Sequence, residues 1–289
     1  MDRKTTIACL SLVLVSCGAR NTIVVGSKNF TEQVLLGEIL AQQIEHQLGV
    51  PVTRKLDLGG TLLAHQAILK GSLDLYPEYT GTALTEILKR PIEPDAGAVF
   101  ESVRQAYRTQ WKLDWFQPFG FNNTFAMIVR RDAGVSTLSQ AAQTRAWHMG
   151  MGYEFEKRSD GLAGLVKAYG LRLQGDPVTV DLGLLYSALE NRKVDMIAAN
   201  FTDGLISSLP VSVLEDDRHY FPPYQCSVIT REDTLARYPK LRGALDELSG
   251  QISNEAMRRL NFEVDGKHRP VSEVAGEFLK QHLWSGRSE

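Results

Sequence analysis

The stretch that most constrains the fold lies at residues 71–88, GSLDLYPEYTGTALTEIL, where a short apolar strand leads into an amphipathic helix. We expect Pro77 to end the strand, because proline has no N–H for a sheet ladder. Tyr79 and Thr82 then fall on the turn between the strand and the helix. In open α/β sheets ligands bind at such turns, so the sequence predicts a small-molecule site here. The alternative is that the tyrosines of this stretch pack beneath a loop.

The same pattern occurs twice in the chain. Residues 57–81 read DLGGTLLAHQAILKGSLDLYPEYTG, and residues 181–204 read DLGLLYSALENRKVDMIAANFTDG. In this alignment Tyr79 falls on Asn200. A strand–turn–helix unit used twice implies two similar lobes, each presenting its turn to the other. A cleft between two α/β lobes is a common location for a small ligand.

Strands alternate with helices along most of the chain, which predicts an α/β fold with mainly parallel sheets. The apolar run FAMIV at residues 125–129 is expected to be a buried strand that crosses from the first lobe to the second. Residues 227–229 are expected to return to the first lobe, and the helices after residue 231 to pack on it. The predicted lobes are residues 22–124 with 228–284, and residues 125–227.

The amino terminus has the pattern of a targeting segment. Arg3 and Lys4 precede a short apolar stretch that ends Leu-Val-Ser-Cys at Cys17. This stretch is too short for a membrane helix, and it resembles a bacterial lipoprotein signal. We predict a signal peptide of residues 1–16 and a lipid on Cys17, which would tether the chain outside the cytoplasm. An ordinary secretory signal is the alternative.

Charge and cysteine content exclude several classes of function. The net charge of −2 argues against a nucleic-acid partner, which would require a basic face. Cys9 is removed with the signal and Cys17 carries the lipid, so only Cys226 remains and no intramolecular disulfide is possible. No CxxC motif is present, so neither a zinc site nor a redox pair is indicated. Cys226 is expected to be a small buried hydrophobe.

Signatures of catalysis are absent from the sequence. It contains no GxSxG, HExxH, phosphate-binding glycine loop or GxGxxG motif. The six histidines are scattered without metal-ligand spacing. We therefore expect a protein that is not an enzyme and that needs no metal or cofactor. A catalytic pair assembled from distant residues is the alternative, which turnover assays on choline-like solutes would reveal.

Four strings carry a resemblance to a known family: SKNFTEQ at 27–33, LGGT at 58–61, DLYPEYTGTAL at 74–84 and TDG at 202–204. They resemble the osmoprotectant-binding proteins of ABC importers, which are receptors for glycine betaine, choline and carnitine. The resemblance covers residues 22–284. It implies a type II periplasmic-binding-protein-like fold, in which two α/β lobes close over a ligand held in the cleft between them.

The resemblance also implies a site for the ligand carboxylate. Lys28 of the SKNF turn and Thr82 of the YTGT turn would face the carboxylate, and Arg158 would join them, held by Glu154. A carboxylate needs such cationic and hydroxyl donors. Two alternatives remain open. Lys28 could be a solvated surface lysine, and Glu154 with Arg158 could be an ordinary i,i+4 surface pair.

The quaternary ammonium end would be held by aromatic faces, because it has no N–H to donate. Each face contributes about 0.5–2 kcal/mol. The resemblance places Tyr79, Phe125 and Tyr224 as walls, with Asn123 beside Phe125 in the site; Tyr224 could instead merely pack on prolines. Phe125 and Asn200 both stand where relatives usually have tyrosine. The asparagine removes one aromatic face, so we expect fewer aromatic walls around the ammonium group.

The sequence thus predicts a lipid-anchored, monomeric receptor that binds a betaine-type solute and delivers it to ABC permease subunits by closing. One alternative is a receptor for a bulkier betaine, such as carnitine or ergothioneine, admitted by Asn200. Another is a sensory lipoprotein of the same fold that feeds no transporter.

Overall fold

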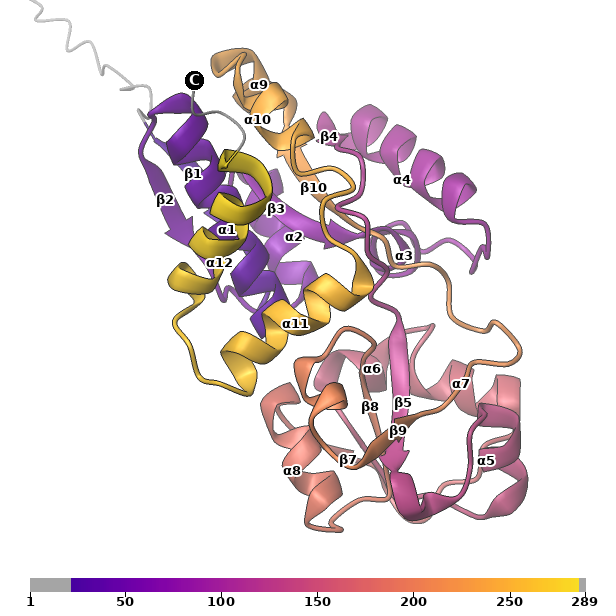
Figure 1. The fold of residues 1–289 in the computed structure, drawn as a ribbon. Coiled ribbons are helices and arrows are strands. Elements are labelled where there is room, and N and C mark those ends of the chain that lie inside the picture. Colours follow the sequence, from indigo (N-terminus) through magenta and orange to yellow (C-terminus); the bar gives the residue numbers. More distant parts are fainter. Residues whose placement is uncertain (1–21, 286–289) are drawn as a thin grey trace, which may run out of the picture.

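The computed structural model describes residues 22–285 of the chain. The predicted signal peptide and Cys17 lie outside these residues. Figure 1 shows two lobes, one above the other, each built around its own sheet. The amino-terminal third and the carboxyl-terminal helices form the upper lobe, and the middle of the chain forms the lower one.

The first lobe contains a five-stranded sheet in the order β2-β1-β3-β10-β4. Strands β1 and β2 are parallel, as are β1 and β3, whereas β10 runs antiparallel to both β3 and β4. The strands are β1 (Ile23–Gly26), β2 (Val52–Lys55), β3 (Leu75–Tyr79), β4 (Leu113–Trp115) and β10 (Cys226–Arg231).

The second lobe repeats this topology in the order β7-β6-β8-β5-β9. Here β6 is parallel to β7 and β8, and β5 is antiparallel to β8 and β9. The strands are β5 (Phe125–Arg130), β6 (Met149–Met151), β7 (Val178–Thr179), β8 (Met196–Asn200) and β9 (Val211–Val213). The sequence echo therefore corresponds to equivalent central strands, since Tyr79 ends β3 and Asn200 ends β8.

Each sheet is mixed: four of its five strands run in one direction, as expected for mainly parallel sheets, and one strand runs against them. In each lobe one strand arrives from the other lobe: β5 enters the second sheet and β10 re-enters the first. Both insert beside the central strand and run antiparallel to it. A strand delivered by a crossing segment is not bound to the parallel βαβ geometry.

Pro77 lies inside β3 and does not end it, so the expectation that it stops the strand was wrong. Pro77 lies opposite Val228 of β10, whose carbonyl accepts the Phe116 N–H on the far side of β10 at 3.0 Å. The Pro77–Val228 pair therefore exchanges no hydrogen bonds. The Pro77 nitrogen, which carries no hydrogen, faces β1. Of the residues of β3, Leu75 alone pairs with β1. The proline thus removes no ladder bond.

Helices cover both sheets. In the first lobe they are α1 (Thr31–Leu48), α2 (Thr61–Leu69), α3 (Thr80–Thr82), α4 (Ala96–Trp111), α9 (Glu232–Arg237), α10 (Leu241–Asp246), α11 (Asn254–Asp265) and α12 (Val271–Leu279). The second lobe has α5 (Leu138–Thr144), α6 (Tyr153–Lys157), α7 (Leu162–Tyr169) and α8 (Leu185–Glu190). A π-helical stretch, Ala83–Ile87, continues α3, and another, Lys280–Trp284, continues α12.

Helix α11 contacts both lobes, so the carboxyl-terminal helices do not all pack on the first lobe alone. Arg258 of α11 donates to the Phe201 carbonyl at 2.8 Å. A Cβ on Gly204 would lie 2.3 Å from the Phe262 backbone nitrogen, which shows how closely the second lobe approaches this helix. In Figure 1 α11 lies at the boundary between the lobes.

Two segments that cross between the lobes pair with each other. Asn122 and Gln225 form an isolated antiparallel bridge. The Asn123 N–H donates to the Tyr224 carbonyl at 3.1 Å, and the Tyr224 N–H donates to Asn122 Oδ1 at 2.6 Å. The crossing is thus a short two-stranded ribbon, which leads directly into β5 and β10.

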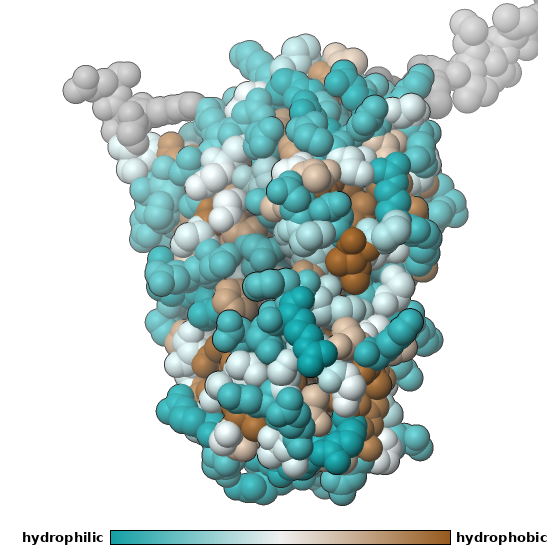
Figure 2. Space-filling view, turned by 90° about the vertical axis from the view of Figure 1, so that its right-hand side faces the viewer, coloured by the Kyte–Doolittle hydropathy of each residue, from teal (hydrophilic) through white to brown (hydrophobic). Residues whose placement is uncertain are grey.

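Apolar side chains fill the space between sheets and helices, and Cys226 is fully buried among them. The face in Figure 2 is mostly hydrophilic, with hydrophobic side chains in small scattered groups. Within residues 22–285, no helix has the length and apolar character that a membrane span requires.

Candidate functional site

A cavity of about 210 Å³ lies between the ends of the two central strands. Its walls come from both lobes and from the crossing ribbon. All nine residues that the sequence indicated for ligand binding line it: Lys28, Tyr79, Thr82, Asn123, Phe125, Glu154, Arg158, Asn200 and Tyr224. Strand ends therefore converge at the cleft as the repeat predicted.

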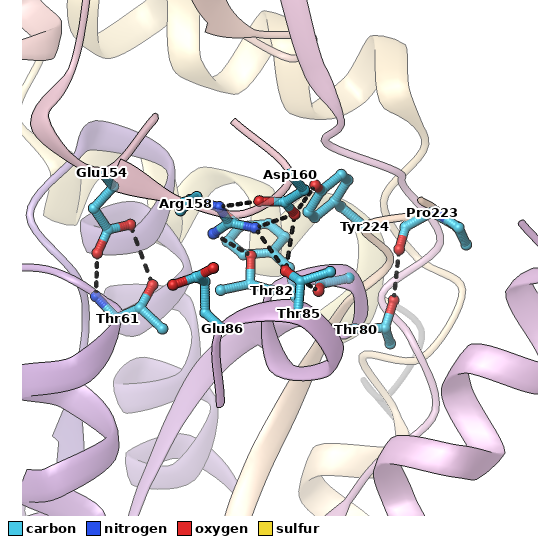
Figure 3. Close-up of polar contacts among 12 residues, drawn as sticks. Thr61, Thr80, Thr82, Thr85, Glu86, Glu154, Arg158, Asp160, Pro223 and Tyr224 are labelled. Atoms are coloured by element: carbon cyan, nitrogen blue, oxygen red, sulfur yellow. Dashed lines mark hydrogen bonds and ion pairs between the residues drawn. The ribbon is translucent and has the colours of Figure 1, made fainter. Parts of the chain in front are cut away.

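Arg158 is buried, with 5% of its surface exposed, and its guanidinium is fixed by an acid two residues later. Nε and Nη2 donate to the two oxygens of Asp160, each at 2.7 Å. Nη1 donates to Thr82 Oγ1 at 3.2 Å and Nη2 to Thr85 Oγ1 at 3.3 Å, both on the first lobe. Tyr224 also donates its hydroxyl to Asp160, at 2.5 Å. Figure 3 shows these groups as one network.

The network sets the charge state of Asp160. Burial raises the pKa of this carboxyl, but the hydrogen bonds and charge of Arg158 outweigh burial and hold the pKa below its usual range. Bidentate pairing also fixes the plane of the guanidinium. The cavity therefore presents a rigid cation whose orientation does not depend on solvent.

Glu154 does not hold Arg158, contrary to the expectation. Its carboxylate accepts the Thr61 backbone N–H at 2.6 Å and the Thr61 hydroxyl at 3.2 Å (Figure 3). This joins α6 of the second lobe to the start of α2 in the first. A Cβ at Gly60 would lie 2.3 Å from Glu154 Oε1, so a larger residue there would displace the Glu154 carboxylate. The surface-pair alternative is wrong as well, because Arg158 is buried.

Lys28 is buried rather than solvated, with 3% of its surface exposed. Its Nζ donates to Glu78 Oε1 at 2.5 Å and lies 4.6 Å from the centre of the Tyr79 ring. Glu78 also accepts the Tyr79 backbone N–H at 2.8 Å. The lysine charge is therefore already paired, and Lys28 braces the Tyr79 ring.

Six aromatic side chains line the cavity, three more than the sequence indicated. The additional ones are Phe30, Tyr153 and Phe155. Phe155 packs edge-on against Phe125 at 4.8 Å between ring centres, and Phe30 stacks with Tyr79 at 6.3 Å. Phe30 immediately precedes α1, and Tyr153 and Phe155 lie in the short helix α6. The cavity is therefore more aromatic than the loss of a tyrosine at position 200 suggests.

Glu32, in the first turn of α1, is a further residue that the sequence did not reveal. Its carboxylate accepts hydrogen bonds from the Tyr79 hydroxyl at 2.7 Å, Asn123 Nδ2 at 2.9 Å, Asn261 Nδ2 at 3.1 Å and the Thr202 hydroxyl. Burial raises the pKa of Glu32, and these four donors lower it. One carboxylate thus ties a cavity wall to the ribbon, to α11 and to the second lobe.

Comparison with known proteins agrees with this geometry. The family model OpuAC, the substrate binding domain of the ABC-type glycine betaine transport system, matches residues 21–281. The chain belongs to the OpuAC family. It is therefore a substrate-binding protein of the betaine, carnitine and choline class of ABC importers, and it is not an enzyme.

Relatives of this OpuAC-family chain include the carnitine transport binding protein OpuCC of Listeria monocytogenes, which is 32% identical over 300 residues, covering 96% of this chain and 95% of the relative. The ergothioneine transport permease/ergothioneine binding protein EgtU of Helicobacter pylori is 32% identical over 265 residues, covering 90% of this chain and 47% of EgtU. A crystal structure of a glycine betaine/carnitine/choline ABC transporter protein superposes with a TM-score of 0.77 at 30% identity, covering 91% of this chain and 99% of that one.

The described part of this OpuAC-family protein contains no group of three or more His, Cys, Asp or Glu side chains that could hold a metal ion. Its lining side chains can bind and orient a solute through rings, one fixed guanidinium and hydroxyls. This agrees with a receptor function.

Proposed function

We propose that this chain is an extracytoplasmic, lipid-anchored receptor that holds a quaternary-ammonium, betaine-type solute in the interlobe cavity and delivers it to an ABC permease. The observation that carries the proposal is the cavity lining: six aromatic rings line the same space as Arg158 and Thr82, and the guanidinium carbon of Arg158 lies 5.1 Å from the centre of the Phe125 ring. The named relatives bind carnitine and ergothioneine, which are both betaines.

The ammonium end of the solute would lie among the rings. A trimethylammonium group offers no hydrogen-bond donor, so ring faces are what can attract it in a site that excludes water. Phe125, Phe155 and Tyr224 pack against one another through Phe125, at 4.8 and 5.6 Å between ring centres. Such mutual packing keeps the rings in place when the cavity is empty and reduces the ordering cost of binding.

The carboxylate end would lie at Arg158. Its guanidinium makes four hydrogen bonds to described residues, and the group has five N–H donors, which leaves one N–H of Nη1 for the solute. The Thr82 hydroxyl accepts from Arg158 and retains its own proton to donate. Lys28 contributes less than the sequence suggests, because Glu78 neutralises it.

Delivery would follow from closure of the two lobes, which we take as residues 22–124 with 228–284 and residues 125–227. Contacts across the cleft include those of Glu154 with Thr61 and of Arg158 with Thr82 and Thr85. A solute that touches both lobes favours the closed form by its differential affinity. A permease could then distinguish loaded from empty receptor by shape.

Calorimetry on the mature protein with glycine betaine, carnitine and choline tests the proposal, with the amino acid valine as the solute that lacks a quaternary ammonium. Saturable binding of at least one quaternary ammonium solute and none of valine is expected. Failure of all three to bind would overturn the ligand class. Sedimentation at the same concentrations tests the monomeric state.

A further inference from the structure

A second cavity, of about 400 Å³, lies directly behind one wall of the first. The two cavities share the wall residues Asn29, Phe30, Asp181, Leu182 and Asn200. Asn200 ends β8 with a short side chain, so the partition is thin at this point. A solute that reached from one space into the other would have to pass this shared wall at Asn200.

The polar lining of this second cavity accepts hydrogen bonds. It contains the acids Glu32, Asp181, Asp203 and Asp265 but no lysine or arginine, and the exposed His268 is the one lining side chain able to carry a positive charge. Asp203 is held in place by the Asn200 N–H and the Tyr186 hydroxyl, each at 3.1 Å. A negatively charged tail would be repelled here, and a group with N–H donors would be favoured.

Asn261 of α11 independently indicates that a hydrogen-bond donor is missing from the second cavity. It lines the second cavity with 2% of its surface exposed. Its Nδ2 donates to Glu32 at 3.1 Å and to the Thr202 carbonyl at 2.9 Å. These two bonds fix the orientation of the amide, while its Oδ1 has no partner within residues 22–285. A buried acceptor without a donor is destabilising, so a ligand that supplies an N–H gains there.

We propose that the second cavity is a subsite for the side chain of an extended betaine, one whose α-carbon carries a group with N–H donors such as an imidazole or an amine. The ammonium and carboxylate would occupy the first cavity, so the inference rests on the proposed function. The acids and Asn261 would then select among betaines by the chemistry of the side chain rather than by its size alone.

The test compares three probes by calorimetry on the mature protein at pH 7.5: glycine betaine, the trimethylated betaine of histidine, and that of phenylalanine. The last two place rings of comparable size in the subsite, and only the histidine compound has a ring N–H. We expect the histidine compound to bind about tenfold more tightly than the phenylalanine compound, which corresponds to about one good hydrogen bond. Equal affinities would overturn the proposal.

Substitutions in the second cavity test whether the preference for the histidine compound arises there. Asp203→Asn and Asp265→Asn remove charge from side chains that line the second cavity alone, while keeping an acceptor oxygen. Each should reduce the preference for the histidine compound at least threefold and leave glycine betaine affinity within twofold. Asp176→Asn, at an exposed position outside both linings, is the matched control and should change neither. A preference that persists in Asp203→Asn/Asp265→Asn would place the ring elsewhere.

The results distinguish failure of the subsite proposal from failure of the proposed function. If glycine betaine binds but the histidine compound shows no preference, the subsite is wrong and the proposed function stands. If none of the three betaines binds, the proposed function itself is wrong.

Discussion

Glu154 of the second lobe accepts two hydrogen bonds from Thr61 of the first, 2.6 Å from its backbone nitrogen and 3.2 Å from its hydroxyl. A carboxylate at the start of a helix is also favoured by the helix dipole. The bond can exist only when the lobes approach, so it stabilises the closed form specifically.

Glu154→Ala should therefore weaken solute binding about tenfold, because closure loses a charge-assisted contact. Calorimetry measures the affinity, and small-angle scattering with saturating solute should show a more open average form. Glu156→Ala is the control, since Glu156 lies on the same helix and bonds Thr179 of its own lobe. A comparable loss in both variants would mean that Glu154 acts through helix stability.

Arg158→Ala should weaken a carboxylate-bearing solute far more than choline, which has no carboxylate. Loss of a buried charged partner costs about 2–5 kcal/mol. Because this variant leaves Asp160 buried and unpaired, Arg158→Ala/Asp160→Asn should be measured in parallel. If both variants lose glycine betaine and choline equally, the carboxylate does not lie at Arg158.

Asn200→Tyr separates small from extended solutes. The new ring adds an aromatic face and takes up space where the two cavities adjoin. Glycine betaine should bind more tightly by about 0.5–2 kcal/mol, and the trimethylated histidine betaine more weakly. Titration calorimetry with the two probes gives both signs, and no change with either would show that position 200 does not face the solute.

The stability of the protein should depend on the ionisation of Asp203. Burial raises the pKa of Asp203 from 3.8 to about 7, partly opposed by hydrogen bonds from Asn200 and Tyr186. Between these two values the folded state holds more protons than the unfolded state, so stability falls as pH rises through this window. Asp203→Asn, which can keep both hydrogen bonds, should raise Tm at pH 8 and change it less at pH 5. An equal Tm change at both pH values would contradict this assignment.

Cys17→Ser should release the chain from the membrane fraction, because the predicted lipid has no other attachment point. Fractionation followed by immunoblotting measures this, and Cys226→Ser, at the buried cysteine, is the control. A Cys17→Ser chain that stays as firmly membrane-bound as the parent would show that the anchor is not there.

The sequence predicted those parts of the site that local pattern determines. The repeat placed Tyr79 and Asn200 at the ends of equivalent strands, and both line the cavity. Arg158 also lines the cavity, but the expectation that Glu154 holds it failed, because a four-residue spacing brings two side chains together only within a continuous helix. Arg158 instead follows α6 in an extended conformation, with ψ of 149°, and its side chain therefore meets Asp160.

Other contacts could not be predicted from local sequence pattern. Glu32 gathers donors that lie 47 to 229 residues away in the chain, and no spacing rule connects them. Pro77 was misjudged for a related reason. Whether a proline interrupts a sheet depends on which edge of the strand faces a partner, and the partner here is a strand from the other end of the chain.

The paired crossing segments restrict how the lobes can move. The two linkers are paired at Asn122–Gln225 and Asn123–Tyr224, so we expect them to bend together and the lobes to move mainly by rotation about this ribbon. Tyr224 is both a member of this ribbon and a wall of the cavity. A solute that contacts the Tyr224 ring therefore acts directly on the ribbon about which the lobes rotate. Binding of the solute and the angle between the lobes are coupled through this one residue.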